Sequence, residues 1–201
     1  KGGPTLYVKK VKDIETINDA KPRRVARVSW DSTISWSPDS KKIAYSYYAS
    51  DVYRHYFYMD LYVYDVEKKQ SKRITRGLRA YHPAWSPKGD KIAFVINQGG
   101  QQKLAVMRYP KDKGYYILLE FDDLTQMGSP KWSPDGTKIA FLMWRHGQQD
   151  IWVINADGTG LRPLTYDVHD DRDPAWMPDS RHVVFSSDRT GIFQLYMIDI
   201  E

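Results

Sequence analysis

A ten-residue segment that recurs four times constrains the fold of this chain more than any other feature. Its clearest copy spans residues 132–141 and reads Trp-Ser-Pro-Asp-Gly-Thr-Lys-Ile-Ala-Phe. The other copies begin at Trp36, Trp85 and Trp176, so that successive tryptophans are 49, 47 and 44 residues apart. Periods of this length are typical of propeller blades and other repeat arrays. The spacing therefore predicts a series of similar structural units.

Each copy also predicts its own local structure. Ser133-Pro134-Asp135-Gly136 is a turn sequence, because proline presets φ at the second position and Asp and Gly suit the third and fourth. The alternating apolar residues that follow predict a second strand after this turn. A third strand begins near residues 6, 61, 104, 151 and 195, and a fourth is expected over 24–28, 72–75, 115–119 and 161–165. The unit is thus four antiparallel strands, which predicts an all-β protein, a β-propeller of four-stranded blades.

The count of strands predicts how much of a ring is present. The third strand occurs five times but the tryptophan hairpin only four times, so one copy would be redundant in a closed four-bladed ring. We expect about four blades, forming a segment of a larger propeller that is truncated at both ends. Residues 1–201 are then a single propeller domain or a partial propeller. Its expected units are 5–28, 33–75, 82–119, 129–165 and an incomplete blade over 173–200.

Composition narrows the classes of function. The 30 Lys and Arg residues are balanced by 25 Asp and Glu residues, and the net charge of +5 is spread along the chain. Nucleic-acid binding is therefore not expected, although it is kept as a third hypothesis that predicts steep salt dependence. The chain has no cysteine, which excludes disulfides and thiol catalysis. No apolar run approaches the roughly 18 residues of a membrane-spanning helix, so no membrane insertion by this segment is expected.

The repeat resembles that of TolB-type β-propellers. The resemblance lies in Pro-x-Trp-Ser-Pro-Asp-Gly-x-x-Ile-Ala-Phe, then Ile-Trp-Val-Ile-Asn-Ala-Asp-Gly-Thr-Gly, then Leu-Thr, and it extends over about residues 5–200. Related blades occur in the non-catalytic propeller of prolyl-oligopeptidase-like serine peptidases. The sequence departs from the pattern at Ile34, where a proline is usual, and at Met177 and Ser180.

The resemblance implies two functions. The first is a non-catalytic module that binds a protein or peptide in the periplasm or cell envelope of a bacterium. The second is the gating or substrate-access propeller of a serine peptidase whose catalytic domain is absent from this chain. Pairing with missing blades or with a second chain is a further implied contact.

Strand direction separates two faces of such a propeller. The Ser-Pro-Asp-Gly turns share one face, and the loops between the second and third strands emerge on the other, where the sequence varies. That loop is six residues longer in the first blade than in the others. Aromatic and arginine side chains are frequent anchors of protein interfaces. The predicted binding residues in this insertion are Tyr53, Arg54, His55, Tyr56 and Tyr58. Alternatively, these rings extend the two strands and pack on the neighbouring blade.

A second candidate site lies where the first strand of each blade begins. Inner strands line a propeller's axis, so polar residues at this end are expected around the mouth of a central channel. The predicted channel-mouth residues are Thr33, Tyr81, His82, Ser129, Arg172 and Asp173. The alternative is that they only solvate a wet channel.

No catalytic residues, metal site or cofactor are predicted. The sequence has no Gly-x-Ser-x-Gly elbow, Walker loop or His-Glu-x-x-His pair, and its five histidines lack ligand spacing. The acidic loop over residues 167–173 offers oxygen ligands for Ca²⁺, but its spacing does not fit an EF-hand and it has no glycine bend. The four repeated tryptophans are expected in the core. A basic group near residues 68–79 is expected to be a solvated outer strand and loop.

Overall fold

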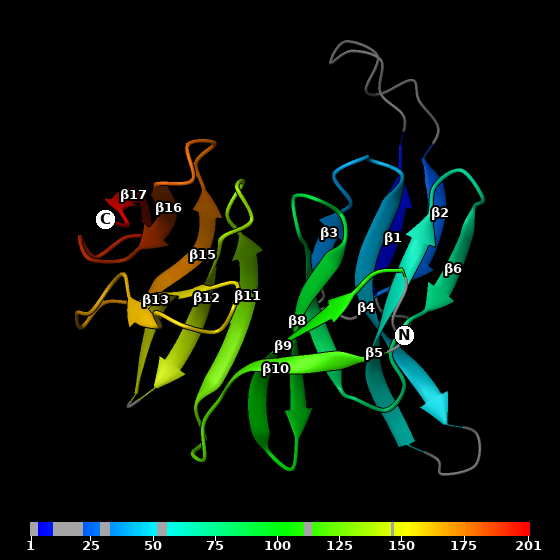
Figure 1. Ribbon diagram of the computed structural model, residues 1–201, viewed down its shortest axis with the longest axis horizontal. Helices are drawn as coiled ribbons and strands as arrows, with labels where there is room; N and C mark the ends of the chain where they lie inside the picture. The colour runs from blue at the N-terminus through cyan, green and yellow to red at the C-terminus, as the bar shows by residue number, and fades with distance from the viewer. Residues whose placement is uncertain (1–3, 10–21, 29–32, 52–55, 111–113, 146) are drawn as a thin grey trace.

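The computed structural model describes residues 4–9, 22–28, 33–51, 56–110, 114–145 and 147–201. All regular structure in these ranges is β-strand, arranged in five antiparallel sheets (Figure 1). Within the same ranges no helix is long and apolar enough to cross a membrane.

The sheets follow the chain from one end to the other. A two-stranded sheet comes first, from β1 (Thr5–Val8) and β2 (Arg23–Arg27). The first complete blade contains β3 (Ile34–Trp36), β4 (Lys42–Asp51), β5 (Tyr56–Asp65) and β6 (Gln70–Arg73). The second contains β7 (Ala80–Trp85), β8 (Lys91–Gln98), β9 (Gln101–Arg108) and β10 (Tyr115–Glu120). The third contains β11 (Gln126–Trp132), β12 (Lys138–Arg145), β13 (Gln148–Asn155) and β14 (Arg162–Pro163). A three-stranded sheet ends the series, with β15 (Asp171–Trp176), β16 (His182–Ser187) and β17 (Gln194–Asp199).

The repeated turns join the first two strands of each blade. In the third blade the Ser133 hydroxyl donates to Asp135 Oδ1 at 2.5 Å and accepts from the Lys138 amide at 2.9 Å. Gly136 completes this turn with φ of 75°, a conformation that side chains disfavour. These turns gather at the top of Figure 1, on what we call the short-turn face. The hairpins β4–β5, β8–β9 and β12–β13 turn at the bottom, on the loop face.

Apolar side chains between neighbouring sheets form the core. Leu104 and Val106 of β9 pack in one cluster with Trp132 and Phe141 of the next blade. The indole N–H of Trp132 donates to the Ala84 carbonyl across the same boundary, at 3.1 Å. Burial of these side chains stabilises each blade against its neighbour, since apolar burial contributes roughly 25 cal/mol per Å².

The expectation that all four repeated tryptophans are core residues is wrong for Trp36. Trp85 and Trp132 are buried and Trp176 is partly buried, but the Trp36 side chain is 46% exposed. The indoles of Trp132 and Trp176 donate to the first strand of the preceding blade, at the carbonyls of Ala84 and Lys131. Before Trp36, the described residues form only β1 and β2, neither of which is such a first strand.

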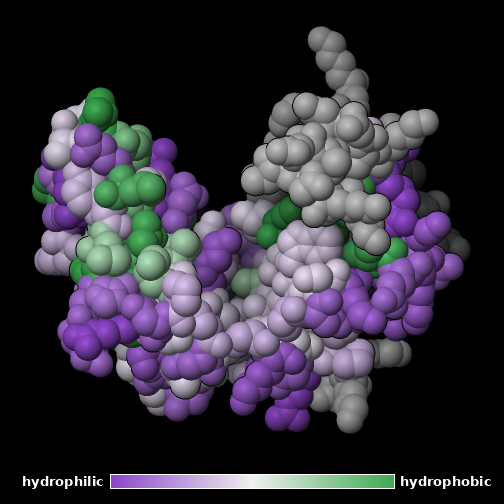
Figure 2. Space-filling view, turned by 90° about the horizontal axis from the view of Figure 1, so that it is seen from above, coloured by the Kyte–Doolittle hydropathy of each residue, from purple (hydrophilic) through white to green (hydrophobic). Residues whose placement is uncertain are grey.

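The five sheets lie along an arc that does not close into a ring. Figure 2, which views the short-turn face, shows two lobes with a hollow between them. Apolar surface gathers on the left-hand lobe, where β15–β17 lie. Two exposed apolar residues of β17 are Leu195 (78% exposed) and Met197 (61%). The equivalent Leu104 and Val106 are buried under the next blade. The arrangement confirms the predicted all-β fold of four-stranded propeller blades, whereas the division into the predicted domain limits stays a prediction.

Candidate functional site

A pocket of about 320 Å³ opens on the loop face between the second and third complete blades. Among the described residues ten line it, and none of these is Asp, Glu, Lys or Arg. The lining residues are Tyr81, His82, Gln102, Gln126, Met127, Gly128, Ser129, Leu142, Trp144 and Gln149. We call it the loop-face pocket. Its walls combine neutral hydrogen-bonding groups with two large aromatic side chains.

Irregularities in the first strands of the second and third blades place residues at this pocket. The ladder between β7 and β8 shifts register between Tyr81 and Ala84, and the β11–β12 ladder shifts between Gly128 and Lys131. Inside these shifts His82 and Ser129 have positive φ, 51° and 48°. Each is followed by a proline, which cannot donate a hydrogen bond to the ladder. Such bulges often re-aim side chains beside functional sites.

The imidazole of His82 bridges the two blades. Its Nδ1 accepts a hydrogen bond from the Ser129 amide at 3.2 Å, so in the neutral ring Nε2 carries the hydrogen. The Tyr81 ring meets it edge-on, with 4.9 Å between ring centroids. A Cβ on Gly128 would lie 3.3 Å from Nδ1, so the glycine lets the ring lie against β11. His82 is therefore held in a defined orientation at the pocket wall.

Two glutamines at the start of a third strand also form hydrogen bonds to the next blade. Gln102 Oε1 accepts from the Met127 amide of the next blade at 2.5 Å. Gln149, at the equivalent position, donates from Nε2 to the Asp171 carbonyl at 3.2 Å. Between them Trp144 pairs in register with Gln126 and Gln149 and remains 46% exposed at the rim. An exposed indole beside amide groups is the kind of anchor found in protein interfaces.

The structure brings together three of the predicted channel-mouth residues, Tyr81, His82 and Ser129. The other three do not line this pocket. Thr33 precedes β3, while Arg172 and Asp173 belong to β15. The Arg172 guanidinium donates to Asp170 at 2.8 Å and covers the Phe193 ring at 4.6 Å. Asp173 has φ of 53°, the same left-handed conformation as His82 and Ser129.

The aromatic insertion of the first blade lengthens the loop-face hairpin. β4 and β5 pair from Lys42 with Asp65 as far as Asp51 with Tyr56. This hairpin is two pairs longer than the corresponding one in each of the next two blades. Tyr53, Arg54 and His55 lie outside the described residues, and Tyr56 is described only through its backbone. Tyr58 is partly buried with the Arg79 guanidinium 5.7 Å from its ring centroid. Strand extension, the alternative to a separate binding loop, accounts for the described part of the insertion.

Sequence reasoning missed most of the remaining lining residues. The available signal was the Gln-Gln pair at residues 101–102 and 148–149, which stands at the same distance before the third strand in two blades. Trp144 gave no such signal, because its exposure depends on how neighbouring blades are angled.

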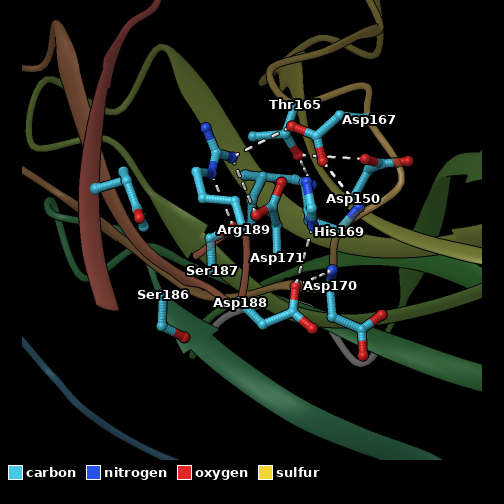
Figure 3. A network of polar contacts seen from close by, with 12 residues as sticks. Asp150, Thr165, Asp167, His169, Asp170, Asp171, Ser186, Ser187, Asp188 and Arg189 are labelled. Carbon is cyan, nitrogen blue, oxygen red and sulfur yellow. Dashed lines mark hydrogen bonds and ion pairs between the residues drawn. The ribbon is translucent and has the colours of Figure 1, made fainter. Parts of the chain in front are cut away.

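A second polar network lies on the loop side of the last boundary (Figure 3). The Asp171 side chain is fully buried; its Oδ1 accepts from Arg189 at 3.3 Å, while its Oδ2 has no hydrogen-bond partner. The same guanidinium pairs with Asp167 at 3.4 Å, and the Asp170 amide donates to Asp188 at 3.0 Å.

Burial, reinforced by the Asp171 carboxylate, raises the pKa of neighbouring Asp150 to about 6. Among the described residues no group of three or more His, Asp or Glu side chains is placed to hold a metal ion. Arg189 and Arg172 place positive charge beside the carboxylates of Asp167, Asp170 and Asp171.

Two family models match parts of the chain. Residues 121–201 match the TolB beta propeller domain, and residues 37–99 match the N-terminal region of dipeptidyl peptidase IV. Each covers less than half of the sequence, and together they reach from the first complete blade to the last sheet.

Solved structures give the same two relationships. TolB from Acinetobacter baumannii is 20% identical, with a TM-score of 0.73 over 98% of this chain and 46% of its own. A putative TolB from Agrobacterium tumefaciens is 21% identical, with a TM-score of 0.76 over 98% of this chain and 70% of its own. Dipeptidyl peptidase 4 from Porphyromonas gingivalis is 15% identical, with a TM-score of 0.59 over 98% of this chain and 35% of its own. The chain thus spans less than half of the first TolB. Residues 121–201 therefore carry the repeat of the TolB beta propeller domain, and the chain as a whole shares the β-propeller fold of TolB and of the peptidase propeller domains.

Proposed function

We propose that this chain is a non-catalytic interaction module that binds a protein or peptide at the loop-face pocket. The observation that carries the proposal is the chemistry of the pocket walls, where amide, imidazole and hydroxyl groups stand beside Tyr81 and Trp144 without any charged side chain. Peptide bonds offer neutral donors and acceptors that match such walls. A small free ion would find no opposite charge among the lining residues.

The size and position of the pocket support an extended segment as ligand. About 320 Å³ lies at the lower end of ordinary ligand sites, enough for one or two side chains. The exposed indole of Trp144 at the rim provides apolar contact area at little conformational cost.

The remaining predicted binding residues extend this surface in our proposal. Tyr58 belongs to a hairpin that turns on the same face as the pocket. Thr33, Arg172 and Asp173 stand at equivalent positions in other blades, and a partner that covers several blades would meet them. The residues proposed for this wider surface are Thr33, Tyr53, Arg54, His55, Tyr56, Tyr58, Arg172 and Asp173. The proposed compartment, the bacterial cell envelope, rests on likeness to TolB.

A gating propeller of a serine peptidase is the second candidate. The match of residues 37–99 to the dipeptidyl peptidase IV region and the likeness to a dipeptidyl peptidase favour it. In that case the loop-face pocket would contact substrate on its way to a catalytic domain supplied by the full-length protein. A nucleophile elbow in the gene downstream of residue 201 would favour this candidate over a stand-alone binding module.

The proposal is tested by selecting peptides from a phage-displayed random library and measuring their affinities by fluorescence anisotropy. Truncation of an interface anchor typically costs at least 2 kcal/mol, so Trp144→Ala should weaken binding by about 30-fold. Tyr116→Ala is the matched control, because Tyr116 is a similarly exposed aromatic residue outside the pocket and should leave affinity unchanged. Peptides that bind both variants as tightly as the wild type would contradict the proposal.

A further inference from the structure

A larger cavity lies on the short-turn face, between the first and second complete blades. Its volume is about 720 Å³, within the range of small-molecule sites. We call it the short-turn pocket. Its charged lining residues are Lys42, Lys68, Lys72, Lys88, Asp39 and Asp65. Four ammonium groups face two carboxylates, so the lining carries a net charge of +2 at neutral pH.

The two carboxylates are already engaged. Asp39 accepts from the Ser37 hydroxyl at 2.5 Å and lies 3.9 Å from Lys42 Nζ. Asp65 accepts from the Lys68 amide at 2.8 Å. Within the described ranges no ion pair is formed by the ammonium groups of Lys68, Lys72 or Lys88. Among the described residues, the pocket lining therefore carries more positive charge than its own ion pairs neutralise.

The basic character arises where the second blade departs from the repeat. The other three turns have Asp39, Asp135 and Asp179 at the position that Lys88 occupies. In the second blade the turn serine, Ser86, instead donates to Asp90 at 2.9 Å. Because the Asp90 carboxylate accepts this hydrogen bond, the turn does not need a carboxylate at position 88. The lysine at this position lies at the pocket lining.

The cavity remains open because of the outer strand of the first blade. Lys72 of β6 pairs with Val63 of the third strand. The residues at the equivalent position of the next two blades are Tyr116 and Arg162. Tyr116 presents a large ring there, and the Arg162 guanidinium donates to the carbonyl of Ile200 in the following sheet. Lys72 has neither the ring nor such a contact.

An aromatic pair forms the apolar part of the wall. The rings of Trp85 and Tyr109 meet edge to face, with 4.8 Å between centroids. The indole N–H of Trp132 and of Trp176 donates to a carbonyl of the preceding blade. Among the described residues the Trp85 indole N–H has no hydrogen-bond partner, although the Trp85 amide donates to the Ser35 hydroxyl of the preceding blade at 2.9 Å.

We propose that the short-turn pocket binds a phosphomonoester of an organic molecule. A phosphomonoester carries about −1.5 to −2 charges at neutral pH, which matches the net charge of the lining. Lysine ammonium groups bind phosphate as point charges, and the Trp85–Tyr109 wall contacts the organic part. The site faces away from the loop-face pocket, so this inference does not depend on the proposed function.

The test is isothermal titration calorimetry of the whole chain with phenyl phosphate, inorganic phosphate and benzoate at low salt. We expect saturable binding at one site, with phenyl phosphate at least 10-fold tighter than either comparison ligand. Lys88→Asp restores the residue of the other three turns and should lower the affinity at least 10-fold. Lys131→Asp makes the same charge change at an exposed lysine outside the pocket and should alter it less than 2-fold.

Two results would overturn the inference. One is the lack of saturable heat with phenyl phosphate up to about 10 mM, weaker than most specific binding. The other is an equal loss in Lys88→Asp and Lys131→Asp, which would indicate attraction to the overall charge. A phosphotyrosine peptide distinguishes the source of the ester. If it binds more tightly than phenyl phosphate, a phosphorylated partner is the ligand; otherwise a free phosphate ester is.

Discussion

The two faces of the arc carry opposite kinds of site at neighbouring blade boundaries. The loop-face pocket is neutral and lined by amides and aromatic rings, whereas the short-turn pocket contains four lysines. Each lies at a boundary between blades and includes residues that vary from one blade to another, such as Trp144 on one face and Lys88 on the other. The comparison indicates that the residues shared by all copies of the repeat form the scaffold, whereas the residues that differ between copies give each pocket its binding properties.

The largest effect is expected for the repeated residue that holds the scaffold. Trp85→Ala should lower the free energy of unfolding by about 3 to 5 kcal/mol, because it removes a buried ring from the core. Trp36→Ala should cost less than about 1 kcal/mol, since that side chain is half exposed. Urea unfolding of both variants measures the difference. Equal losses would show that the repeat does not act through blade packing.

Substitution of Asp150, on the loop side, should have an intermediate and pH-dependent effect on the free energy of unfolding. Its pKa of about 6 in the folded protein lies above its ordinary value of 3.8. Folding therefore takes up a proton between about pH 4 and 6, and the free energy of unfolding falls as the pH rises through this window. Asp150→Asn should stabilise the protein by about 1 to 2 kcal/mol at pH 7.5 and by much less at pH 4.

The control for this prediction is Asp60, which stands at the equivalent position in the first blade. Its carboxylate is buried but accepts from Arg73, from the Thr75 hydroxyl at 2.7 Å and from the Gly77 amide at 2.9 Å. Asp60→Asn should destabilise the protein at pH 7.5, because those donors lose a charged acceptor. Thermal melts at the two pH values decide. Destabilisation by Asp150→Asn at pH 7.5 would contradict the assigned difference between the aspartates.

The smallest expected effect, about 1 kcal/mol in binding free energy, is that of salt on ligand binding at the two pockets. Phosphomonoester binding at the short-turn pocket should weaken several-fold between low and high ionic strength, because salt screens the exposed lysines. Selected peptides at the neutral loop-face pocket should lose less than 2-fold over the same range. The same titrations at two salt concentrations provide the measurement, and equal salt dependence would remove the electrostatic distinction.

The sequence predicted the scaffold well because each turn is encoded locally. Ser133, Asp135 and Gly136 form the turn that their order predicts, and the apolar alternation at Ile139 and Phe141 predicts the following strand. The exposure of Trp36 could not be anticipated in this way. It depends on which strands the preceding sheet contains, a property of the assembled array.

The candidate sites were only partly predictable for the same reason. His82 and Ser129 each stand three residues before the repeated tryptophan, where the first strand begins, and this position pointed to the channel mouth. Whether they meet, and whether Arg172 joins them, depends on the angle between blades. Lys88 was visible as a departure from the turn sequence, but the cavity beside it also requires the outer strand of another blade to leave space.

Photo-cross-linking in the cell envelope tests the central claim, that partners bind on the loop face, most directly. A photoreactive phenylalanine analogue is incorporated into the full-length protein in place of Trp144, and separately in place of Tyr116. The account predicts a discrete protein adduct from position 144 and none from position 116. An adduct from position 116 with none from position 144 would contradict it.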